Sequence, residues 1–174
     1  MNLLEQFKCI KTFVFDLDGV LTDGSLLILN GNDFLRTMNI KDGYAIQLAV
    51  KKGYQVVVIS GSVSKPCAER LAYLGVKNVF MKVMDKEEVL AQYLLANNLK
   101  WEDSLFMGDD IPDLEVMKMV GLAACPADAA TEIKLVSKFI SSVNGGKGCA
   151  REVIEKVLRL NDHWLQPSAD TAAI

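Results

Sequence analysis

The segment from residue 12 to residue 24, TFVFDLDGVLTDG, constrains the fold more than any other stretch of the chain. Its apolar run at 13–15 is typical of a strand buried on both faces of a parallel sheet. Asp16 and Asp18 follow at once, with Gly19 directly after them. Because parallel α/β sheets bind ligands at the carboxyl ends of their strands, both acids are candidate site residues. Two acids this close repel each other, which favours a divalent cation, a shared proton or a solvated loop.

Strand and helix patterns alternate along the rest of the chain. Each apolar run is followed by a helix signal, such as the N-cap candidate Asp85 or the helix-ending Gly53 and Gly75. This alternation predicts an α/β fold, a doubly wound parallel sheet with helices on both faces. We expect one domain over 1–165 and a C-terminal tail over 166–174. The predicted strands are 55–59, 78–81, 105–107, 122–124 and 139–140, and the predicted helices are 42–50, 64–74, 85–97, about 114–120 and 149–160.

A small β-hairpin is predicted as an insertion at about 25–38. Its arms, 25–29 and 34–38, flank the turn signal Asn30-Gly31. The first arm has apolar residues at every position from 26 to 29, so both of its faces need cover. A hairpin cannot supply that cover alone, and we expect it to pack on another subunit.

Composition excludes several classes of protein. The net charge of −3 argues against a nucleic-acid-binding surface. No apolar run is long enough for a membrane span, and the N-terminus lacks a signal-peptide layout, so a cytoplasmic location is expected. The four cysteines form no Cys-x-x-Cys pair, which argues against a zinc cage or a redox motif.

Polar side chains follow three of the predicted strands and should meet in one crevice. Asp16 and Asp18 follow the first strand, Ser60 follows the second, and an acidic run at 109–113 follows a later one. Aspartates with little histidine suit Mg²⁺ rather than zinc, and such a site suits a phosphoryl group. Lys86, at the start of a predicted helix, is the candidate cation. Alternatively, Lys86 is a solvated lysine at a helix end and Ser60 belongs to a plain turn.

Four ordered motifs carry a resemblance to a known family. Asp16-Leu17-Asp18-Gly19-Val20, Ser60, Lys86 and Gly108-Asp109-Asp110-Ile111-Pro112-Asp113 resemble the signature motifs of the haloacid dehalogenase superfamily. The segments 18–24, 41–44 and 145–148, with Arg151-Glu152, resemble its small sugar-acid phosphatases. The resemblance implies a Rossmann-like fold and Mg²⁺-dependent phosphomonoester hydrolysis.

The same resemblance implies individual roles. Asp16 is the expected nucleophile, forming an aspartyl-phosphate, and Asp18 the expected acid and base. Ser60 and Lys86 are expected to bind the phosphoryl group, and Asp113 to cap its helix or orient Lys86. The metal ligands implied are Asp16, the backbone carbonyl of Asp18, Asp109, and Asp110 through water.

Many members of this superfamily carry a cap domain, whereas this chain has only the hairpin in its place. Capless relatives assemble as homotetramers in which a neighbouring subunit completes each active site. The resemblance therefore implies a homotetramer with active sites at subunit interfaces. It leaves open whether the tail closes a neighbouring site.

The implied substrate is a phosphorylated 2-keto-3-deoxy sugar acid. The first expectation is 3-deoxy-D-manno-octulosonate 8-phosphate, of lipopolysaccharide synthesis. A nonulosonate 9-phosphate is the alternative, because Ser62 and Lys147 stand where many relatives have arginine. The candidate substrate-binding residues are Lys41, Gly61, Lys65, Arg70 and Lys147. Each of the lysines and the arginine can equally be a surface charge.

Two non-hydrolytic readings remain. A phospho-acceptor signalling domain uses similar residues, but its acceptor follows the third strand, whereas here the acids follow the first. A catalytically silent oligomerisation module is disfavoured by the complete set of acids.

Overall fold

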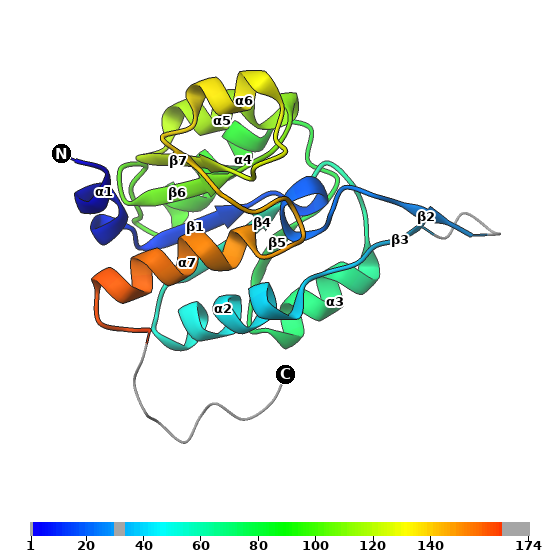
Figure 1. Cartoon of the computed structure of the whole chain (residues 1–174), viewed down its shortest axis with the longest axis horizontal. Coiled ribbons are helices and arrows are strands. Elements are labelled where there is room, and N and C mark those ends of the chain that lie inside the picture. Colours follow the sequence, from blue (N-terminus) through cyan, green and yellow to red (C-terminus); the bar gives the residue numbers. More distant parts are fainter. Residues whose placement is uncertain (1, 30–33, 165–174) are drawn as a thin grey trace.

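The computed structural model describes residues 2–29 and 34–164 (Figure 1). Within them, six strands form one sheet whose neighbouring strands are all parallel. This architecture confirms the predicted doubly wound sheet. In sheet order the strands are β5 (Asn78–Phe80), β4 (Gln55–Ile59), β1 (Thr12–Phe15), β6 (Ser104–Met107), β7 (Leu122–Cys125) and β8 (Phe139–Ile140).

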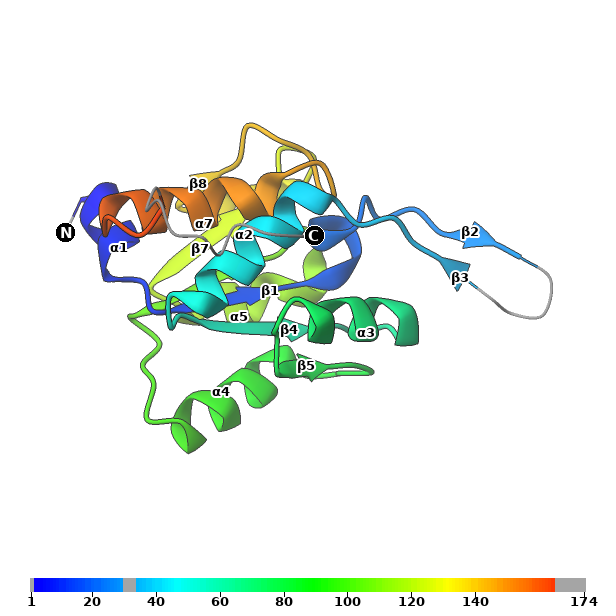
Figure 2. The same ribbon diagram turned by 90° about the horizontal axis from the view of Figure 1, so that it is seen from below.

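Helices cover both faces of the sheet (Figures 1 and 2). Residues of β1 alternate between two apolar cores, since Phe13 and Phe15 pack into one and Val14 into the other. This two-sided burial explains why the strand is continuously apolar. The first face is covered by α1 (Leu3–Cys9), α2 (Ile40–Lys51), α3 (Lys65–Tyr73) and α7 (Cys149–Leu160), and the second by α4 (Lys86–Ala96), α5 (Leu114–Met119) and α6 (Thr131–Val136).

The hairpin projects from the body of the molecule (Figure 1). Its strands, β2 (Leu27–Ile28) and β3 (Phe34–Leu35), pair antiparallel and are shorter than predicted. An antiparallel bridge between Thr22 and Met38 closes its base. The predicted turn at 30–33 and the tail at 166–174 lie outside the described residues. Apolar side chains of both hairpin strands are exposed, Ile28 by 70%.

Two short helices, α1 and α6, are absent from the sequence-based prediction. Helix α1 begins with a capping box in which the Asn2 side chain accepts from the Glu5 N–H and the Glu5 side chain accepts from the Asn2 N–H. Helix α6 follows Ala130, which offers no side-chain cap. Among the described residues, no helix combines the length and apolar character needed to cross a membrane.

Candidate active site

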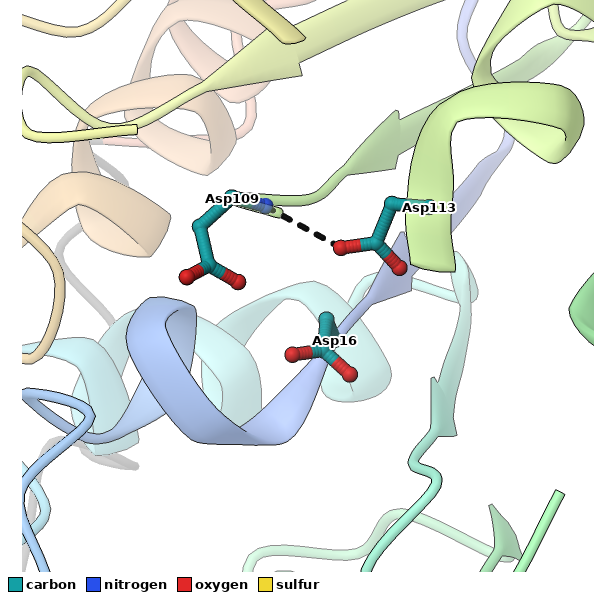
Figure 3. A group of neighbouring side chains, drawn as sticks. All are labelled: Asp16, Asp109 and Asp113. Atoms are coloured by element: carbon teal, nitrogen blue, oxygen red, sulfur yellow. Dashed lines mark hydrogen bonds between the residues drawn. The ribbon is translucent and has the colours of Figure 1, made fainter. Parts of the chain in front are cut away.

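The candidate site lies at two neighbouring strands whose following helices cover opposite faces of the sheet. After β1 the chain continues to α2 on one face, and after the neighbouring β6 it continues to α5 on the other. Such a divergence opens a crevice at the carboxyl ends of the two strands. Carboxylate oxygens of Asp16, Asp109 and Asp113 gather there within 4.8 Å of one another (Figure 3).

One ammonium lies among these acids. Lys86 Nζ donates to Asp16 Oδ1 and to Asp113 Oδ1, both at 2.6 Å. The Lys86 side chain is only 6% exposed. It opens α4, where the Asp85 side chain accepts from the Glu88 N–H. Helix α4 thus fixes the lysine that connects the first and the last acidic motifs.

Burial and mutual repulsion disfavour ionisation of the acids. Burial first, and then the charge of Asp113, raises the pKa of Asp16 to about 6 despite the Lys86 contact. Burial together with the Asp16 and Asp113 charges raises the pKa of Asp109 to about 8. Desolvation opposes the charge on Lys86, but the Asp16 and Asp113 carboxylates outweigh it and raise the pKa of the lysine.

The electrostatics of this cluster suit a divalent cation. When ionised, the three carboxylates face one ammonium, and a hard cation would relieve the excess negative charge that opposes their ionisation. All the side-chain donors of the cluster are oxygens, and oxygen is the donor that Mg²⁺ prefers. The residues present therefore fit the predicted Mg²⁺.

The turn after β1 depends on a glycine. Gly19 has a φ of +95°, and a Cβ atom at this position would lie 2.0 Å from Asp109 Oδ2. The glycine-rich loop before α7 packs against the same turn, because a Cβ atom at Gly145 would lie 1.9 Å from the carbonyl oxygen of Gly19. The Gly146 N–H donates to the Val20 carbonyl at 2.9 Å. The first motif, the last motif and this loop thus form one closely packed unit.

Asp18 has a different set of partners from Asp16. Arg36 donates to both of its oxygens, from Nε at 2.6 Å and from Nη2 at 3.0 Å. Ser62 Oγ donates at 2.7 Å and Thr22 Oγ1 at 3.2 Å. Burial alone would raise the pKa of Asp18, but the hydrogen bonds from Arg36 and Ser62 outweigh burial and lower it. Ser60 is buried beside this group, its Oγ 3.0 Å from Ser62 Oγ.

The remaining predicted site residues lie outside the acidic cluster. Asp110 is exposed and its side chain accepts from the Ile111 N–H, as the cap of the short helical turn Ile111–Asp113. Their positions are as follows: Lys41 is exposed in the first turn of α2, Gly61 is exposed after β4, Lys65 pairs with Glu69 at 3.7 Å, Arg70 lies over the Tyr73 ring, and Lys147 pairs with Asp23 at 3.3 Å.

Sequence reasoning missed Arg36. It follows β3 and enters the site from the hairpin. A single arginine at the end of an apolar arm is the signal that could have indicated it. Its partner was not predictable, because the return path of the hairpin decides which acid it reaches.

Comparison with known proteins defines the class of this protein. The profile of the haloacid dehalogenase-like hydrolase family matches residues 73–153. The chain belongs to this superfamily, as its fold and motif positions predict, and it is a phosphatase.

The similarity extends to one group of these enzymes. The chain is 31% identical over 157 residues to the 3-deoxy-D-manno-octulosonate 8-phosphate phosphatase of Escherichia coli K12. The aligned residues cover 90% of this chain and 84% of that protein. The crystal structure of the Yersinia pestis enzyme matches with a TM-score of 0.90 at 28% identity, over 93% of this chain and 88% of that one. The Moraxella catarrhalis enzyme, solved with magnesium, phosphate and 3-deoxy-D-manno-octulosonate, matches with a TM-score of 0.89 at 25% identity, over 92% of each chain.

Proposed function

We propose that this phosphatase hydrolyses 3-deoxy-D-manno-octulosonate 8-phosphate with Mg²⁺ as its cofactor and Asp16 as its nucleophile. The observation that carries the proposal is the contact of Lys86 with both Asp16 and Asp113, beside Asp109, at the carboxyl ends of β1 and β6. The similarity to octulosonate phosphatases supports the substrate class.

Asp16 attacks phosphorus, and the bond between phosphorus and the sugar oxygen breaks. Asp18 is ionised in the free enzyme, because, despite burial, Arg36 and Ser62 lower its pKa, so it first takes up a proton from solvent and then gives that proton to the leaving alkoxide. Asp18 then takes a proton from water as that water attacks the aspartyl-phosphate, which releases inorganic phosphate and restores Asp16. Lys86 stabilises the charge of Asp16 before attack. Asp16 and Asp109 would hold Mg²⁺, with the Asp18 backbone carbonyl and with Asp110 through water, and the ion would neutralise phosphoryl charge.

A nonulosonate 9-phosphate is the second candidate substrate. The observation that favours it is Ser62, whose hydroxyl donates to Asp18 and which provides no cation for a substrate carboxylate at this position. Serine is also shorter than the arginine expected in many relatives, which leaves more room for a nine-carbon sugar.

A phosphate-release screen tests both substrates. Purified enzyme should release phosphate from eight- or nine-carbon keto-acid phosphates in the presence of Mg²⁺, and far more slowly from hexose phosphates. Chelation by EDTA should stop turnover, and added Mg²⁺ should restore it. Turnover of hexose phosphates alone would exclude the proposed substrate class.

The nucleophile is tested by Asp16→Asn. The amide keeps the size of the side chain but cannot form the acyl-phosphate, so turnover should fall to background. A folded Asp16→Asn protein that still turns over would refute the assignment of the nucleophile. Asp103→Asn, which removes the carboxylate of a surface pair with Lys11, is the matched control and should retain full activity.

We also propose that the enzyme assembles as a homotetramer through the hairpin. The support is the exposure of apolar side chains on both hairpin strands, which a monomer would leave in water. The neighbouring subunit would then border the site, because Arg36 ties the base of the hairpin to Asp18.

A further inference from the structure

Both oxygens of Asp18 are already occupied in the structure. Arg36 binds them in the two-point geometry that matches a guanidinium to a carboxylate. Thr22 donates a further hydrogen bond to Oδ1, and Ser62 donates one to Oδ2. The proposed acid and base must reach the leaving oxygen and then a water, so at least one of these four contacts has to open during turnover.

Arg36 is the partner best placed to move. Thr22 lies four residues from Asp18, and Ser62 lies in the loop after the buried strand β4. Arg36 instead comes from the end of the hairpin, whose strand residues Phe34 and Leu35 are almost half exposed. Its own side chain is only 6% exposed. A buried cationic group is therefore carried by the least buried element of the fold.

Arg36, which contacts Asp18, also lines a cavity of about 250 Å³ between the hairpin arm and α3. Arg70 of α3 is a second guanidinium in this wall, and Ser64 adds a hydroxyl. The other lining side chains, among them Phe34, Met38 and Cys67, are apolar. With two cations and no acid in its lining, the cavity suits a small organic anion, and a carboxylate is the group that guanidinium binds with two hydrogen bonds.

We propose that Arg36 is a specificity-determining residue which the carboxylate of the substrate draws away from Asp18. The proposal rests on the proposed function, since it requires an acidic sugar phosphate. In the free enzyme Arg36 donates hydrogen bonds to both carboxylate oxygens of Asp18. A substrate carboxylate in the cavity competes for the same guanidinium and leaves Asp18 free to reach the leaving oxygen. A neutral sugar phosphate has no group that competes for Arg36, so Asp18 stays occupied and turnover is slow.

The test compares an acidic and a neutral substrate in the same variants. Values of kcat/KM are measured for octulosonate 8-phosphate and for glucose 6-phosphate in the wild type, Arg36→Gln and Arg36→Lys. In Arg36→Gln the ratio of the acidic to the neutral kcat/KM should fall about 10- to 100-fold, the range expected for hydrogen bonds to a charged group. The value for the neutral substrate should rise severalfold, because Asp18 is no longer held. Arg36→Lys, which keeps the charge but not the fork, should lie between.

Arg159→Gln is the matched control, because Arg159 binds Glu155 with two hydrogen bonds on α7, away from the site. It should keep the wild-type ratio of the two kcat/KM values. An equal loss for both substrates in Arg36→Gln would overturn the proposal, since a purely structural role predicts that result. If Arg36→Gln fails to fold, Arg36→Lys decides the question by the same ratio. A wild type without any preference for acidic substrates would overturn the proposed function as well.

Discussion

Gly19 occupies a position in the site where no side chain fits. Gly19 combines a φ of +95° with a Cβ position 2.0 Å from Asp109 Oδ2, a distance that no side chain can occupy. Gly53 has a similar φ of +87°, but open space surrounds it. The two glycines therefore separate the cost of backbone strain from the cost of displacing a site carboxylate.

We predict that Gly19→Ala abolishes Mg²⁺-dependent turnover and costs more than about 2 kcal/mol of unfolding free energy. The strain of a positive φ accounts for about 1 kcal/mol, and the clash with Asp109 for the rest. Gly53→Ala should lose only about 1 kcal/mol and keep its activity. Urea unfolding and phosphate release measure both quantities. Normal turnover in Gly19→Ala would mean that the Asp109 carboxylate can move aside without loss.

At this scale the sequence indicates the reactive residues well but not their partners. Asp16, Asp109 and Lys86 were predictable to lie near one another, because strand ends and a helix start place them from local signals. The contact of Arg36 with Asp18 depends on the course of the hairpin, and no local pattern of residues encodes it. Asp110, proposed to hold the metal through water, also caps a helical turn, a contact that its own local hydrogen bonding decides.

At the scale of elements, a buried acid connects two helices of one face. Asp42, in the first turn of α2, is 2% exposed, and its Oδ1 accepts from the Arg151 N–H near the start of α7 at 2.6 Å. Among the described residues its Oδ2 has no hydrogen-bond partner. Burial raises the pKa of Asp42 to about 6, which the hydrogen bond from Arg151 only partly offsets.

This raised pKa predicts a dependence of stability on pH. Between about pH 4 and pH 6 the folded protein keeps a proton on Asp42 that the unfolded chain releases. Asp42 therefore contributes a fall in unfolding free energy as the pH rises through this window, by at most about 3 kcal/mol. Asp42→Asn cannot ionise and keeps an acceptor for the Arg151 N–H, so the variant should lack this contribution.

Urea unfolding at several pH values, in EDTA, measures the difference between Asp42→Asn and the wild type. That difference should shift in favour of the variant as the pH rises. Asp103→Asn, at a partly exposed acid, should follow the wild-type curve. A constant difference between Asp42→Asn and the wild type would contradict the prediction.

Elements were predictable where burial imposes a period. The strands of the sheet and helices α2, α3, α4 and α7 were recognised because their apolar runs and caps are local signals. Helices α1 and α6 were missed since each spans fewer than two full turns and, unlike the similarly short α5, neither follows a recognised motif. The hairpin strands were predicted too long, because apolar residues around them were interpreted as paired backbone.

For the whole molecule, the hairpin sets the expected assembly. Its exposed apolar side chains lie on both strands and on an element that cannot bury them itself. Neither composition nor local pattern determines how many copies meet there, so the sequence predicts a subunit contact but not its geometry.

We predict that Ile28→Asp breaks the assembly and lowers turnover. A charge in an apolar interface is costly to bury, and the hairpin carries Arg36 to the site. Light scattering should show a smaller mass for this variant, with an unchanged circular dichroism spectrum. Leu135→Asp, at a similarly exposed apolar position on α6, should leave the mass unchanged. A monomeric wild type would exclude assembly through the hairpin.

The close contact between Gly145 and the carbonyl of Gly19 has a consequence for the order of folding. The turn that carries the first acids also packs against a loop about 125 residues later in the sequence. A contact between segments so far apart in the sequence requires closure of a long loop of chain. Hydrolysis of substrate should therefore begin only after this loop has packed on the turn, so the return of activity during refolding reports completed folding.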